Sequence, residues 1–378
     1  MIKQLVMEGY RGFERYTLAN LSRVNLLVGK NNSGKSSILE AVQLLADGGD
    51  FRTLDQTARR RGETILPPSD MGRATTARLP DISHFFHGHS IEPGSQFWLY
   101  SGDSFGFLGF EIVPISDYRG KLPRSAAGLE LLDPADFILV VGAQDGGYSR
   151  SPWDDHPAVP VSMAGAFDPR RAFTRHARLA AFPRMEGLPS LFLPPESLDR
   201  GELVELWDKI ITDGDEGEVV RAMQLLEPDL TSIAFLSGER SAASDPRGGV
   251  VVGFQGEPQR RPLGSHGEGM RRLLTLAVVL ARTKGGVLLI DEVDTGLHYS
   301  ILGDVWSLIV ETAVRNDVQV FLTTHSLDSL RALAWFCGAR PDLAGEVTVQ
   351  KIERRLDEAV AFEASEIQIA IEQDIEVR

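Results

Sequence analysis

Residues 24–36 read VNLLVGKNNSGKS, an apolar run that leads into a glycine-rich segment. The last eight residues, 29–36, fit the pattern G-x-x-x-x-G-K-[ST], which holds phosphate groups when a strand precedes it and a helix follows. Here the apolar run is typical of a buried strand, and residues 38–45 are typical of a helix. The stretch therefore predicts a phosphate-binding loop, with an ordinary glycine- and asparagine-rich turn as the alternative.

The glycines and the lysine of this loop have separate chemical roles. Gly29 and Gly34 let the backbone turn inward, so that successive N–H groups and the positive end of the following helix point at a β-phosphate. Lys35 is predicted to reach the β- and γ-phosphates, and the Ser36 hydroxyl to ligate Mg²⁺. The sequence therefore predicts a site for ATP or GTP with Mg²⁺, whose nucleotide-contacting residues are Asn31, Asn32, Ser33, Gly34, Lys35, Ser36 and Ser37.

A second part of the same site is predicted far downstream, in residues 287–292, which read VLLIDE. Four consecutive apolar residues are typical of a buried strand in a parallel sheet, and open α/β sheets bind ligands at the carboxyl ends of their strands. Asp291 is predicted to hold Mg²⁺ through a water molecule, and Glu292 to act as the general base on the attacking water. The alternative is a core strand that ends in two solvated acids.

About 250 residues separate the two motifs, far more than a single βαβ crossover uses. An inserted region is therefore expected between them. Further segments complete an ordered series, which is more specific than any one of its pieces. They are LGSHGEG at residues 263–269 ahead of a predicted helix at 270–281, DTGLH at 294–298, and a predicted strand at 318–322 followed by Thr323, Thr324, His325 and Ser326.

This ordered series resembles the ABC-type ATPase heads of chromosome-maintenance and RecF-like proteins, and most closely the overcoming-lysogenization-defect (OLD) family and related AAA-family ATPases of anti-phage systems. Together with the segment Tyr10, Arg11, Gly12 and Phe13, the matching pieces cover about the first fifty and the last one hundred and fifty residues. The resemblance implies an α/β fold, an ABC-type P-loop ATPase head. A mixed sheet flanked by helices would be joined to an antiparallel subdomain and an inserted, partly helical lobe.

In that family two heads clamp two ATP molecules between them, head to tail. The resemblance implies that the signature residues Ser265, Gly267 and Glu268 of one subunit contact the γ-phosphate held by the other. A helix N-terminus with a hydroxyl at its cap is a good anion site, which gives this assignment a local physical reason. The alternative is an ordinary capped helix start. His266 stands where the family's signature has glycine.

The resemblance also implies roles for two further residues. His325 would reach the γ-phosphate as the switch residue that polarises it and senses its loss, and the alternative is a polar residue at a strand-to-helix corner. Arg11 would lie near the nucleotide base or phosphates, or else be a surface arginine on a hairpin. We find no equivalent of the family's glutamine loop, which leaves one metal ligand unnamed, and water would complete the octahedral coordination of Mg²⁺.

The composition predicts a globular cytoplasmic protein. The chain has 378 residues, of which 43% are hydrophobic, enough for one large core or two modest ones. No apolar stretch has the length of a bilayer span, and the first residues lack the apolar core of a signal peptide, so no membrane partner is expected. The single cysteine, Cys337, excludes an internal disulfide and is expected to be buried as a small hydrophobic residue.

The charge argues against a surface that binds nucleic acid throughout. The net charge is −14, from 53 acidic residues against 39 lysines and arginines, so DNA would need a local basic patch. The candidate clusters are more simply solvated faces or partners of the many acids. They are Arg59 to Arg61, Arg170 and Arg171 with Arg175 and Arg178, and Arg260 with Arg261.

Two arginines after the signature and three closely spaced histidines form two smaller candidate groups. Arg271 and Arg272 follow the signature, where a positive charge that faces a partner's ATP would help the two heads to engage. His84, His87 and His89 have the spacing of metal ligands, but no cysteine or carboxylate nearby completes a tetrahedral set, so a zinc site is not predicted.

The chain divides into four predicted parts. Residues 1–50 form the N-terminal part of the head, and 51–141 an antiparallel subdomain with strands at 96–100, 107–113 and 131–141. Residues 142–229 are predicted to be an insertion or lid, irregular up to residue 200 and with short helices at 203–211 and 219–226. Residues 230–378 complete the head, with strands at 233–236, 250–254, 346–353 and 359–363 and a helix at 366–373.

Together with the resemblance, these features predict a Mg²⁺-dependent ATPase that dimerises or oligomerises around ATP. Longer members of the family carry a TOPRIM nuclease domain after the ATPase, and this chain is expected to lack one. The resemblance then implies a sensor or scaffold subunit that controls a separately encoded nuclease or toxin in anti-phage defence. The alternatives are a RecF-like genome-maintenance ATPase that binds DNA, and an assembly module in which ATP only holds the interface together.

Overall fold

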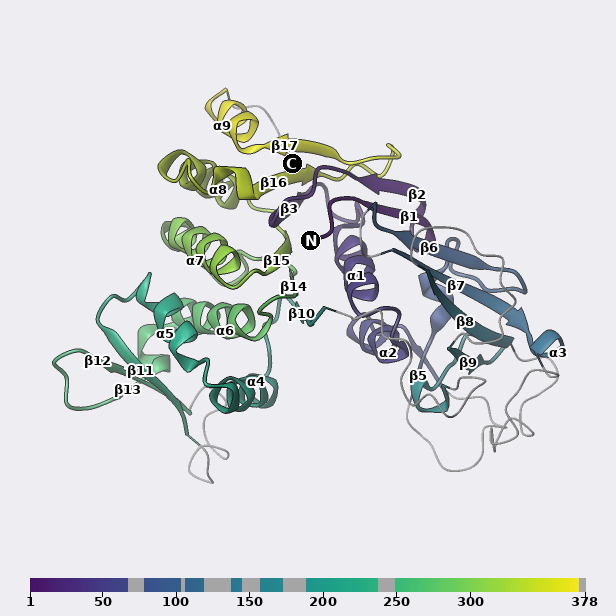
Figure 1. Ribbon diagram of the computed structural model, residues 1–378, viewed down its shortest axis with the longest axis horizontal. Helices are drawn as coiled ribbons and strands as arrows, with labels where there is room; N and C mark the ends of the chain where they lie inside the picture. Colours follow the sequence, from purple (N-terminus) through teal and green to yellow (C-terminus); the bar gives the residue numbers. More distant parts are fainter. Residues whose placement is uncertain are drawn as a thin grey trace.

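The computed structural model describes residues 1–66, 78–102, 106–118, 137–144, 157–172, 188–236 and 249–373. Two six-stranded sheets organise these residues. One is almost entirely parallel and carries both predicted phosphate motifs, the other is antiparallel, and α1 and α2 lie between them (Figure 1). This architecture confirms the predicted α/β class, with a mixed sheet flanked by helices and an antiparallel subdomain.

The first sheet brings together strands that are far apart in the sequence. Its order is β10-β14-β15-β3-β16-β17, and only β17 runs antiparallel to its neighbour. The strand before the phosphate loop, β3, therefore lies inside the sheet, between two strands from the C-terminal part of the chain. The strands are β3 (Val24–Val28), β10 (Ser190–Leu193), β14 (Val287–Ile290), β15 (Gln319–Thr323), β16 (Val347–Lys351) and β17 (Val360–Glu363).

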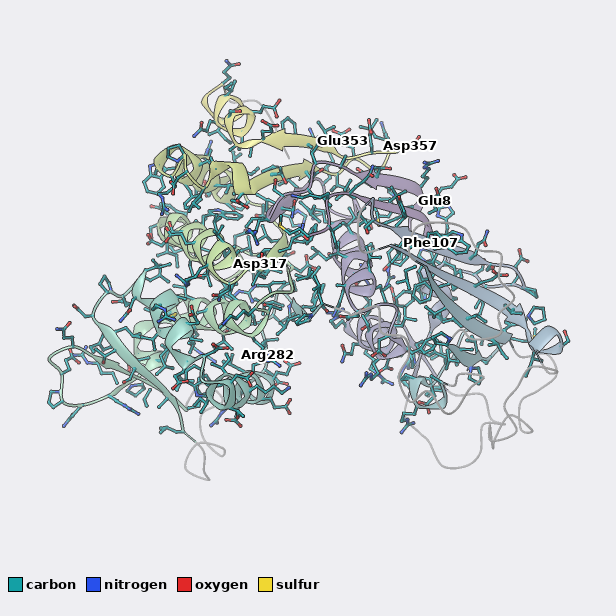
Figure 2. The ribbon with its side chains drawn as sticks, in the orientation of Figure 1. Glu8, Phe107, Arg282, Asp317, Glu353 and Asp357 are labelled. Carbon is teal, nitrogen blue, oxygen red and sulfur yellow. The ribbon has the colours of Figure 1, made fainter. Side chains whose placement is uncertain are left out.

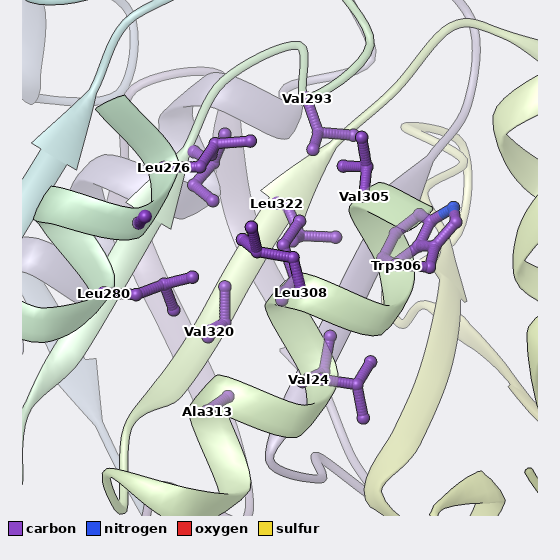
Figure 3. Close-up of a cluster of buried hydrophobic side chains, with 14 of the residues drawn as sticks. Val24, Leu276, Leu280, Val293, Val305, Trp306, Leu308, Ala313, Val320 and Leu322 are labelled. Carbon is purple, nitrogen blue, oxygen red and sulfur yellow. The ribbon is translucent and has the colours of Figure 1, made fainter. Parts of the chain in front are cut away.

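Both faces of this sheet are buried. Successive side chains of a strand point to opposite faces, so a strand that is covered on both sides must be apolar throughout. Leu322 packs in one cluster with Leu276 and Trp306, which come from the helices on one face (Figure 3). The adjacent residue, Phe321, belongs to a second cluster on the other face. Alternate residues of each continuous apolar run thus belong to the two hydrophobic cores on opposite faces of the sheet.

Helices cover each face of the sheet. On one side lie α6 (Glu268–Arg282), α7 (Leu302–Arg315) and α8 (Leu327–Ala339), and on the other lie α1 (Lys35–Ala46) and α2 (Phe51–Arg60) (Figure 1). A further helix, α9 (Ala364–Glu372), packs on α8 and on β16 and β17. Among the described residues, no helix is both long and apolar enough to cross a membrane.

The second sheet has the order β2-β1-β6-β7-β8-β9, with every neighbouring pair antiparallel. Its buried face is aromatic, because Phe97 and Phe110 stack with their ring centroids 4.3 Å apart. The strands are β1 (Leu5–Tyr10), β2 (Phe13–Leu18), β6 (Gln96–Tyr100), β7 (Phe107–Pro114), β8 (Phe137–Gln144) and β9 (Ala158–Val161). Short elements on this side are β4 (Thr64–Ile65), β5 (Leu79–Pro80), α3 (Ile115–Tyr118) and 3-10 helices at Ile82–Phe85 and Pro169–Arg171.

One long excursion of the chain leaves the first sheet after β10 and returns at β14. It carries α4 (Arg200–Asp213), α5 (Glu216–Gln224) and a small sheet of β11 (Leu230–Phe235), β12 (Val250–Phe254) and β13 (Arg261–Pro262), and it ends with α6. Trp207 of α4 stacks on Phe235 of β11, with ring centroids 4.8 Å apart. Arg282, which is labelled in Figure 2, lies at the end of α6. Its Nη1 is 4.0 Å from Oδ2 of Asp213 at the end of α4. Among the described residues of this lobe, α4 and α5 therefore pack on α6.

The structure corrects the prediction that residues 142–200 are irregular. Residues 158–161 form β9 of the antiparallel sheet, and residues 190–193 form β10, which pairs in parallel with the acidic-motif strand β14. The guanidinium of Arg60, on α2, lies 3.7 Å from the ring centroid of Phe192 and ties β10 to the rest of the head.

The other predicted elements are present with small shifts at their ends. The helices predicted at 203–211 and 219–226 are α4 and α5, and the strands predicted at 233–236 and 346–353 are β11 and β16. Of the strand predicted at 131–141, residues 131–136 lie outside the described residues and the remainder belongs to β8. The division into parts that end at residues 50, 141 and 229 stays a prediction.

Candidate functional site

The phosphate loop connects β3 to α1 through a backbone that only glycine can adopt at two positions. Gly29 has φ 144° and Gly34 has φ 103°, both outside the region favoured by L side chains. A Cβ at Gly29 would lie 2.6 Å from the carbonyl oxygen of Ile352, and one at Gly34 would overlap the ring of Phe13. The loop is thus held between β16 and the first hairpin, with Asn31 and Asn32 exposed at its tip.

Lys35, the first residue of α1, points back into the loop. Its Nζ donates hydrogen bonds to the carbonyl oxygens of Gly29, at 2.8 Å, and Lys30, at 3.0 Å. Burial lowers the pKa of Lys35 to about 8, and the charges of Asp291 and Glu292 oppose that shift. These two acids are therefore near enough to interact with the lysine, which joins the two motifs of the sequence in one site.

The loop has the features of a phosphate cradle. The Ser33 side-chain oxygen is buried and has no hydrogen-bond partner within the described part of the chain. A buried hydroxyl without a partner is costly unless a ligand supplies one. The hydroxyl of Ser36 is on a half-buried residue at the start of α1, and Ser37 is buried beside it. Together with the glycine conformations, these residues fit a bound polyphosphate.

The acidic motif follows β14 at the carboxyl end of the first sheet. Asp291 accepts a hydrogen bond from the hydroxyl of Thr323, at 2.6 Å, and the backbone N–H of Glu292 donates to the same hydroxyl, at 2.8 Å. Glu292 has φ 50°, a left-handed conformation that is unusual for a glutamate. Its side chain accepts a hydrogen bond from the hydroxyl of Thr295, at 2.9 Å. The carboxylates of residues 291 and 292 are therefore both fixed at this edge.

A divalent cation fits the donor set at this edge. Mg²⁺ prefers oxygen ligands and is commonly bound by one or two carboxylates together with phosphate oxygens and water. The Ser36 hydroxyl and the Asp291 carboxylate are oxygen donors of this kind. Asp291 keeps one oxygen outside its contact with Thr323, since only Oδ1 is engaged in that bond. When bound, the metal would neutralise phosphate charge.

The signature segment forms a 3-10 helix (Leu263–His266) that leads into α6. Ser265 is exposed, and Gly267, not Ser265, is the N-cap of α6, with no side-chain hydrogen bond to the helix start. Ser265 therefore does not cap the helix, which removes both the expected hydroxyl at the cap and the alternative of a serine-capped helix start. Gly267 has φ 90° and open space around it. The side chains of His266 and Glu268 lie outside what the structure describes.

The predicted switch histidine, His325, is at the corner between β15 and α8. His325 is exposed, and the next residue, Ser326, caps α8 by accepting a hydrogen bond from the N–H of Ser329, at 3.3 Å. Next to it, the hydroxyl of Thr324 donates to the carboxylate of Asp294. Residues 294–298, the predicted D-loop, therefore touch the switch segment, and Gly296 of that loop is exposed.

Arg11 is not a surface residue on a hairpin. It is 3% exposed, and its guanidinium pairs with Glu40 of α1, at 2.9 Å, and with Glu63, at 2.8 Å. Burial alone would lower the pKa of Arg11, but Glu40, Tyr10 and Glu63 raise it above its ordinary value. Arg11 thus fastens the first hairpin to the helix of the phosphate loop, and a direct contact with nucleotide stays a prediction.

Arg272 also differs from its prediction, because it is buried and does not face outward. It is 5% exposed and donates to the carbonyl oxygens of Pro194, at 3.3 Å, and Glu292, at 3.5 Å. Burial lowers the pKa of Arg272, and Asp294, Glu196 and Glu292 act against that shift. This arginine joins α6, the end of β10 and the acidic motif.

Sequence reasoning missed Glu196. Because β10 runs parallel to β14, the residues after it come to the same edge of the sheet as Asp291 and Glu292. Glu196 follows β10 by three residues and is charge-coupled to Arg272. The only sign of β10 in the sequence is the short apolar run SLFL between prolines at 189 and 194. A run this short cannot be distinguished from a loop by its sequence.

The basic clusters are mostly paired with acids, as the simpler alternative predicted. Arg61 pairs with Glu40, at 2.6 Å, and the other pairs have similar distances. Arg175 and Arg178 lie outside the described residues. The further pairs are Arg59 with Asp55, Arg170 with Asp168, and Arg261 with Glu257.

The histidines at 84, 87 and 89 and the single cysteine are the remaining residue groups. Across the described ranges, no cluster of three or more histidine, cysteine or carboxylate side chains could hold a metal ion. His84 instead lies 3.6 Å from Asp81. Cys337 is 2% exposed, and burial raises the pKa of its thiol to about 11. A thiol of this kind is unreactive.

Two family profiles match the chain. Residues 178–331 match the family described as "AAA domain, putative AbiEii toxin, Type IV TA system", and residues 1–76 match the "AAA ATPase domain". An ATP/GTP phosphatase of Helicobacter pylori is 19% identical over 350 residues, which cover 88% of this chain and 87% of that protein. RecF of Bifidobacterium longum subsp. infantis is 26% identical over 186 residues, which cover 48% of this chain and 39% of RecF.

Solved structures include distant likenesses. An Smc head bound to the C-terminal winged-helix domain of ScpA is 15% identical with a TM-score of 0.46, over 96% of this chain and 98% of that chain. A RecF structure is 13% identical with a TM-score of 0.40, also over 96% of this chain and 98% of that chain. The chain is thus similar to ATPase domains of the AAA family over residues 1–76 and 178–331, and to RecF over about half of its length.

Proposed function

We propose that this protein is a Mg²⁺-dependent ATPase whose subunits associate around bound ATP. The observation that carries the proposal is the convergence of Lys35, Asp291 and Glu292 at one edge of the sheet, where the two acids act on the pKa of the lysine. In this arrangement the loop N–H groups and Lys35 would hold the β- and γ-phosphates. Ser36 and Asp291 would hold the metal, which neutralises charge on the phosphates.

Glu292 is the residue proposed to take the proton from the attacking water. A general base must lie within hydrogen-bond reach of that water, and its carboxylate must be held still. The contact from Thr295 to one carboxylate oxygen and the anchored backbone N–H leave the other oxygen, Oε1, to accept the proton. His325, exposed at the neighbouring strand end, is proposed to contact the γ-phosphate.

The signature is proposed to complete the site of a second subunit. Within the described residues, Ser265 makes no hydrogen bond to the phosphate loop of its own chain, and it is exposed beside a glycine with open space around it. Its neighbour Gly267, the N-cap of α6, makes no side-chain cap, and the N–H groups at a helix N-terminus bind anions. A γ-phosphate presented by a partner subunit fits this surface.

Replacing Ser265 tests the shared site. Ser265→Arg should abolish ATP-dependent self-association and leave ATP binding by the single subunit unchanged, because the added side chain blocks only the surface that faces the partner. Lys35→Ala should abolish both. Size-exclusion chromatography with light scattering, with and without ATP, and a fluorescent-nucleotide titration at low protein concentration measure the two effects. Unaltered assembly of Ser265→Arg would exclude the shared-site geometry.

The pKa of Lys35 predicts how ATP affinity depends on pH. A neutral lysine cannot pair with phosphate, and bound phosphate favours the protonated amine, so ATP binding is coupled to proton uptake at pH values above about 8. The dissociation constant of ATP should therefore rise above pH 8 by up to about tenfold per pH unit. Titrations between pH 7 and 9.5 measure this slope. Lys35→Arg is the control, because its guanidinium stays charged and the slope should disappear.

As a biological role, we propose a sensor or scaffold subunit that controls a separately encoded nuclease or toxin in anti-phage defence. The description of the profile over residues 178–331, which refers to a toxin, supports this role. A phage challenge of cells that carry the gene with its neighbouring genes, in wild-type and Lys35→Ala forms, tests it. Protection that does not depend on Lys35 would contradict it.

The alternative is direct action on DNA, which the likeness to RecF favours. A DNA-binding titration at increasing salt separates the two roles, because contacts with phosphates give a steep loss of affinity with salt. The net charge of −14 and the pairing of Arg59, Arg61, Arg170 and Arg261 with acids argue for weak binding. Tight, salt-sensitive binding that requires ATP would favour the alternative.

A further inference from the structure

Two consecutive threonines at the end of β15 connect three parts of the proposed site. Thr323 and Thr324 are both buried, with exposures of 0% and 1%. The hydroxyl of Thr323 donates to Asp291 and accepts from the N–H of Glu292, while its carbonyl oxygen accepts from the N–H of Val293, at 3.0 Å. A single residue thus holds the whole turn that carries the two acids.

Thr324 makes a second set of contacts. Its hydroxyl donates to Asp294 of the D-loop and accepts from the N–H of Ser326, at 3.0 Å, while its own N–H donates to the carbonyl oxygen of Leu27, at 3.3 Å. One buried side chain therefore joins the D-loop to the segment that carries His325. The backbone of the same residue is tied to β3, the strand that leads into the phosphate loop.

The conformation of Glu292 shows why such an anchor is needed. A non-glycine residue with φ near 50° is strained and persists only when its surroundings hold it. Thr323 supplies that restraint through the N–H of Glu292 and through the preceding carboxylate. The hydroxyl also decides which Asp291 oxygen is engaged and which is left for a metal.

We propose that Thr323 and Thr324 are positioning residues of the hydrolysis site. Thr323 sets the places of the metal-binding Asp291 and the base Glu292. Thr324 transmits displacement of the switch segment around His325 to Asp294, and hence to the D-loop at the surface where a second subunit is proposed to bind. This inference rests on the proposed ATPase function and adds the means by which the state of the nucleotide reaches the interface.

Thr323→Val tests the first role, because it keeps the shape of the side chain and removes the hydroxyl. The expected result is a fall in kcat of about 10- to 100-fold, the usual effect of losing a residue that orients a metal ligand. The Mg²⁺ concentration for half-maximal activity should rise, and KM for ATP should stay the same. Thr323→Ser restores the hydroxyl and should recover kcat. A Thr323→Val protein with normal kcat and normal Mg²⁺ dependence would overturn this role.

Thr324→Val tests the second role. It should bind ATP as tightly as the wild type when the protein is dilute, because no loop contact is lost. The protein concentration needed for half-maximal ATP-dependent association should rise by about tenfold. This is the lower end of what is usually lost when a residue that orients a functional group is removed. Thr324→Ser should behave as the wild type. Association of Thr324→Val that equals that of the wild type would overturn the proposed connection.

Thr348→Val is the matched control for general loss of stability. Thr348 is also a buried strand threonine of the same sheet, and its hydroxyl donates to Asn25, at 2.9 Å, away from the acids. Its kcat per folded molecule and its ATP-dependent association should equal those of the wild type. If the wild type does not hydrolyse ATP, the proposed function fails. If it does, and the two valine variants match this control, only the positioning role fails.

Discussion

Glu292→Gln is expected to bind ATP and to hydrolyse it about a hundred to ten thousand times more slowly than the wild type, the range that general-base assistance contributes. Glutamine has the size of glutamate, and its carbonyl oxygen can still accept the hydrogen bond from Thr295. It cannot take a proton from water. Single-turnover hydrolysis measures the rate, and light scattering should show an ATP-bound assembly that persists instead of dissociating.

A matched control keeps this result specific. Glu205→Gln makes the same chemical change at an exposed position of α4, and its hydrolysis rate should equal that of the wild type. If Glu292→Gln hydrolyses ATP at the normal rate, the base is another group and the role assigned to Glu292 is wrong. Slow hydrolysis with weakened ATP binding would instead indicate damage to the phosphate loop.

Of the substitutions proposed for this protein, Glu40→Ala is expected to lower the free energy of unfolding most. Glu40 is 3% exposed in the middle of α1 and pairs with two arginines, Arg11 at 2.9 Å and Arg61 at 2.6 Å. Its removal leaves the buried charge of Arg11 with one fewer partner, and breaking a buried pair typically lowers the free energy of unfolding by about 3–5 kcal/mol. Urea denaturation measures the change.

The controls for this prediction separate burial from charge. Asp328→Ala removes one partner of the exposed pair with Arg331, whose side chains are 58% and 52% exposed, and should change stability by less than about 1 kcal/mol. The double variant Arg11→Met with Glu40→Met should be more stable than Glu40→Ala, because the two most deeply buried charges of the network are removed together. Equal effects of Glu40→Ala and Asp328→Ala would contradict the buried network.

The elements that could be predicted from the sequence are those with local patterns. The phosphate loop and the acidic strand each lie within a few residues, and the run VLLI followed by two acids is typical of a strand that is covered on both faces. Lys35 and Asp291 could therefore be assigned to one site before their interaction was seen. The roles of Ser265 and His325 depend on a second subunit and on nucleotide, and they stay predictions.

What could not be predicted depends on distant partners. The four residues of β10 form a strand because β14, almost a hundred residues later, pairs with them. Arg11 is buried because Glu40 and Glu63 meet it, and Arg272 turns inward because carbonyl oxygens after β10 and β14 accept its hydrogen bonds. The residues next to an arginine in the sequence do not show whether its side chain is buried, because the groups that bind it lie far away in the chain.

The position of β3 has a consequence for how the protein is made. Its two neighbours, β15 and β16, begin at Gln319 and Val347, about three hundred residues later. Contacts this far apart in a chain form slowly, because a long loop must close first. During synthesis, the loop that emerges first from the ribosome must wait for nearly the last strands, so the nascent chain should gain affinity for ATP only after residue 351 has emerged.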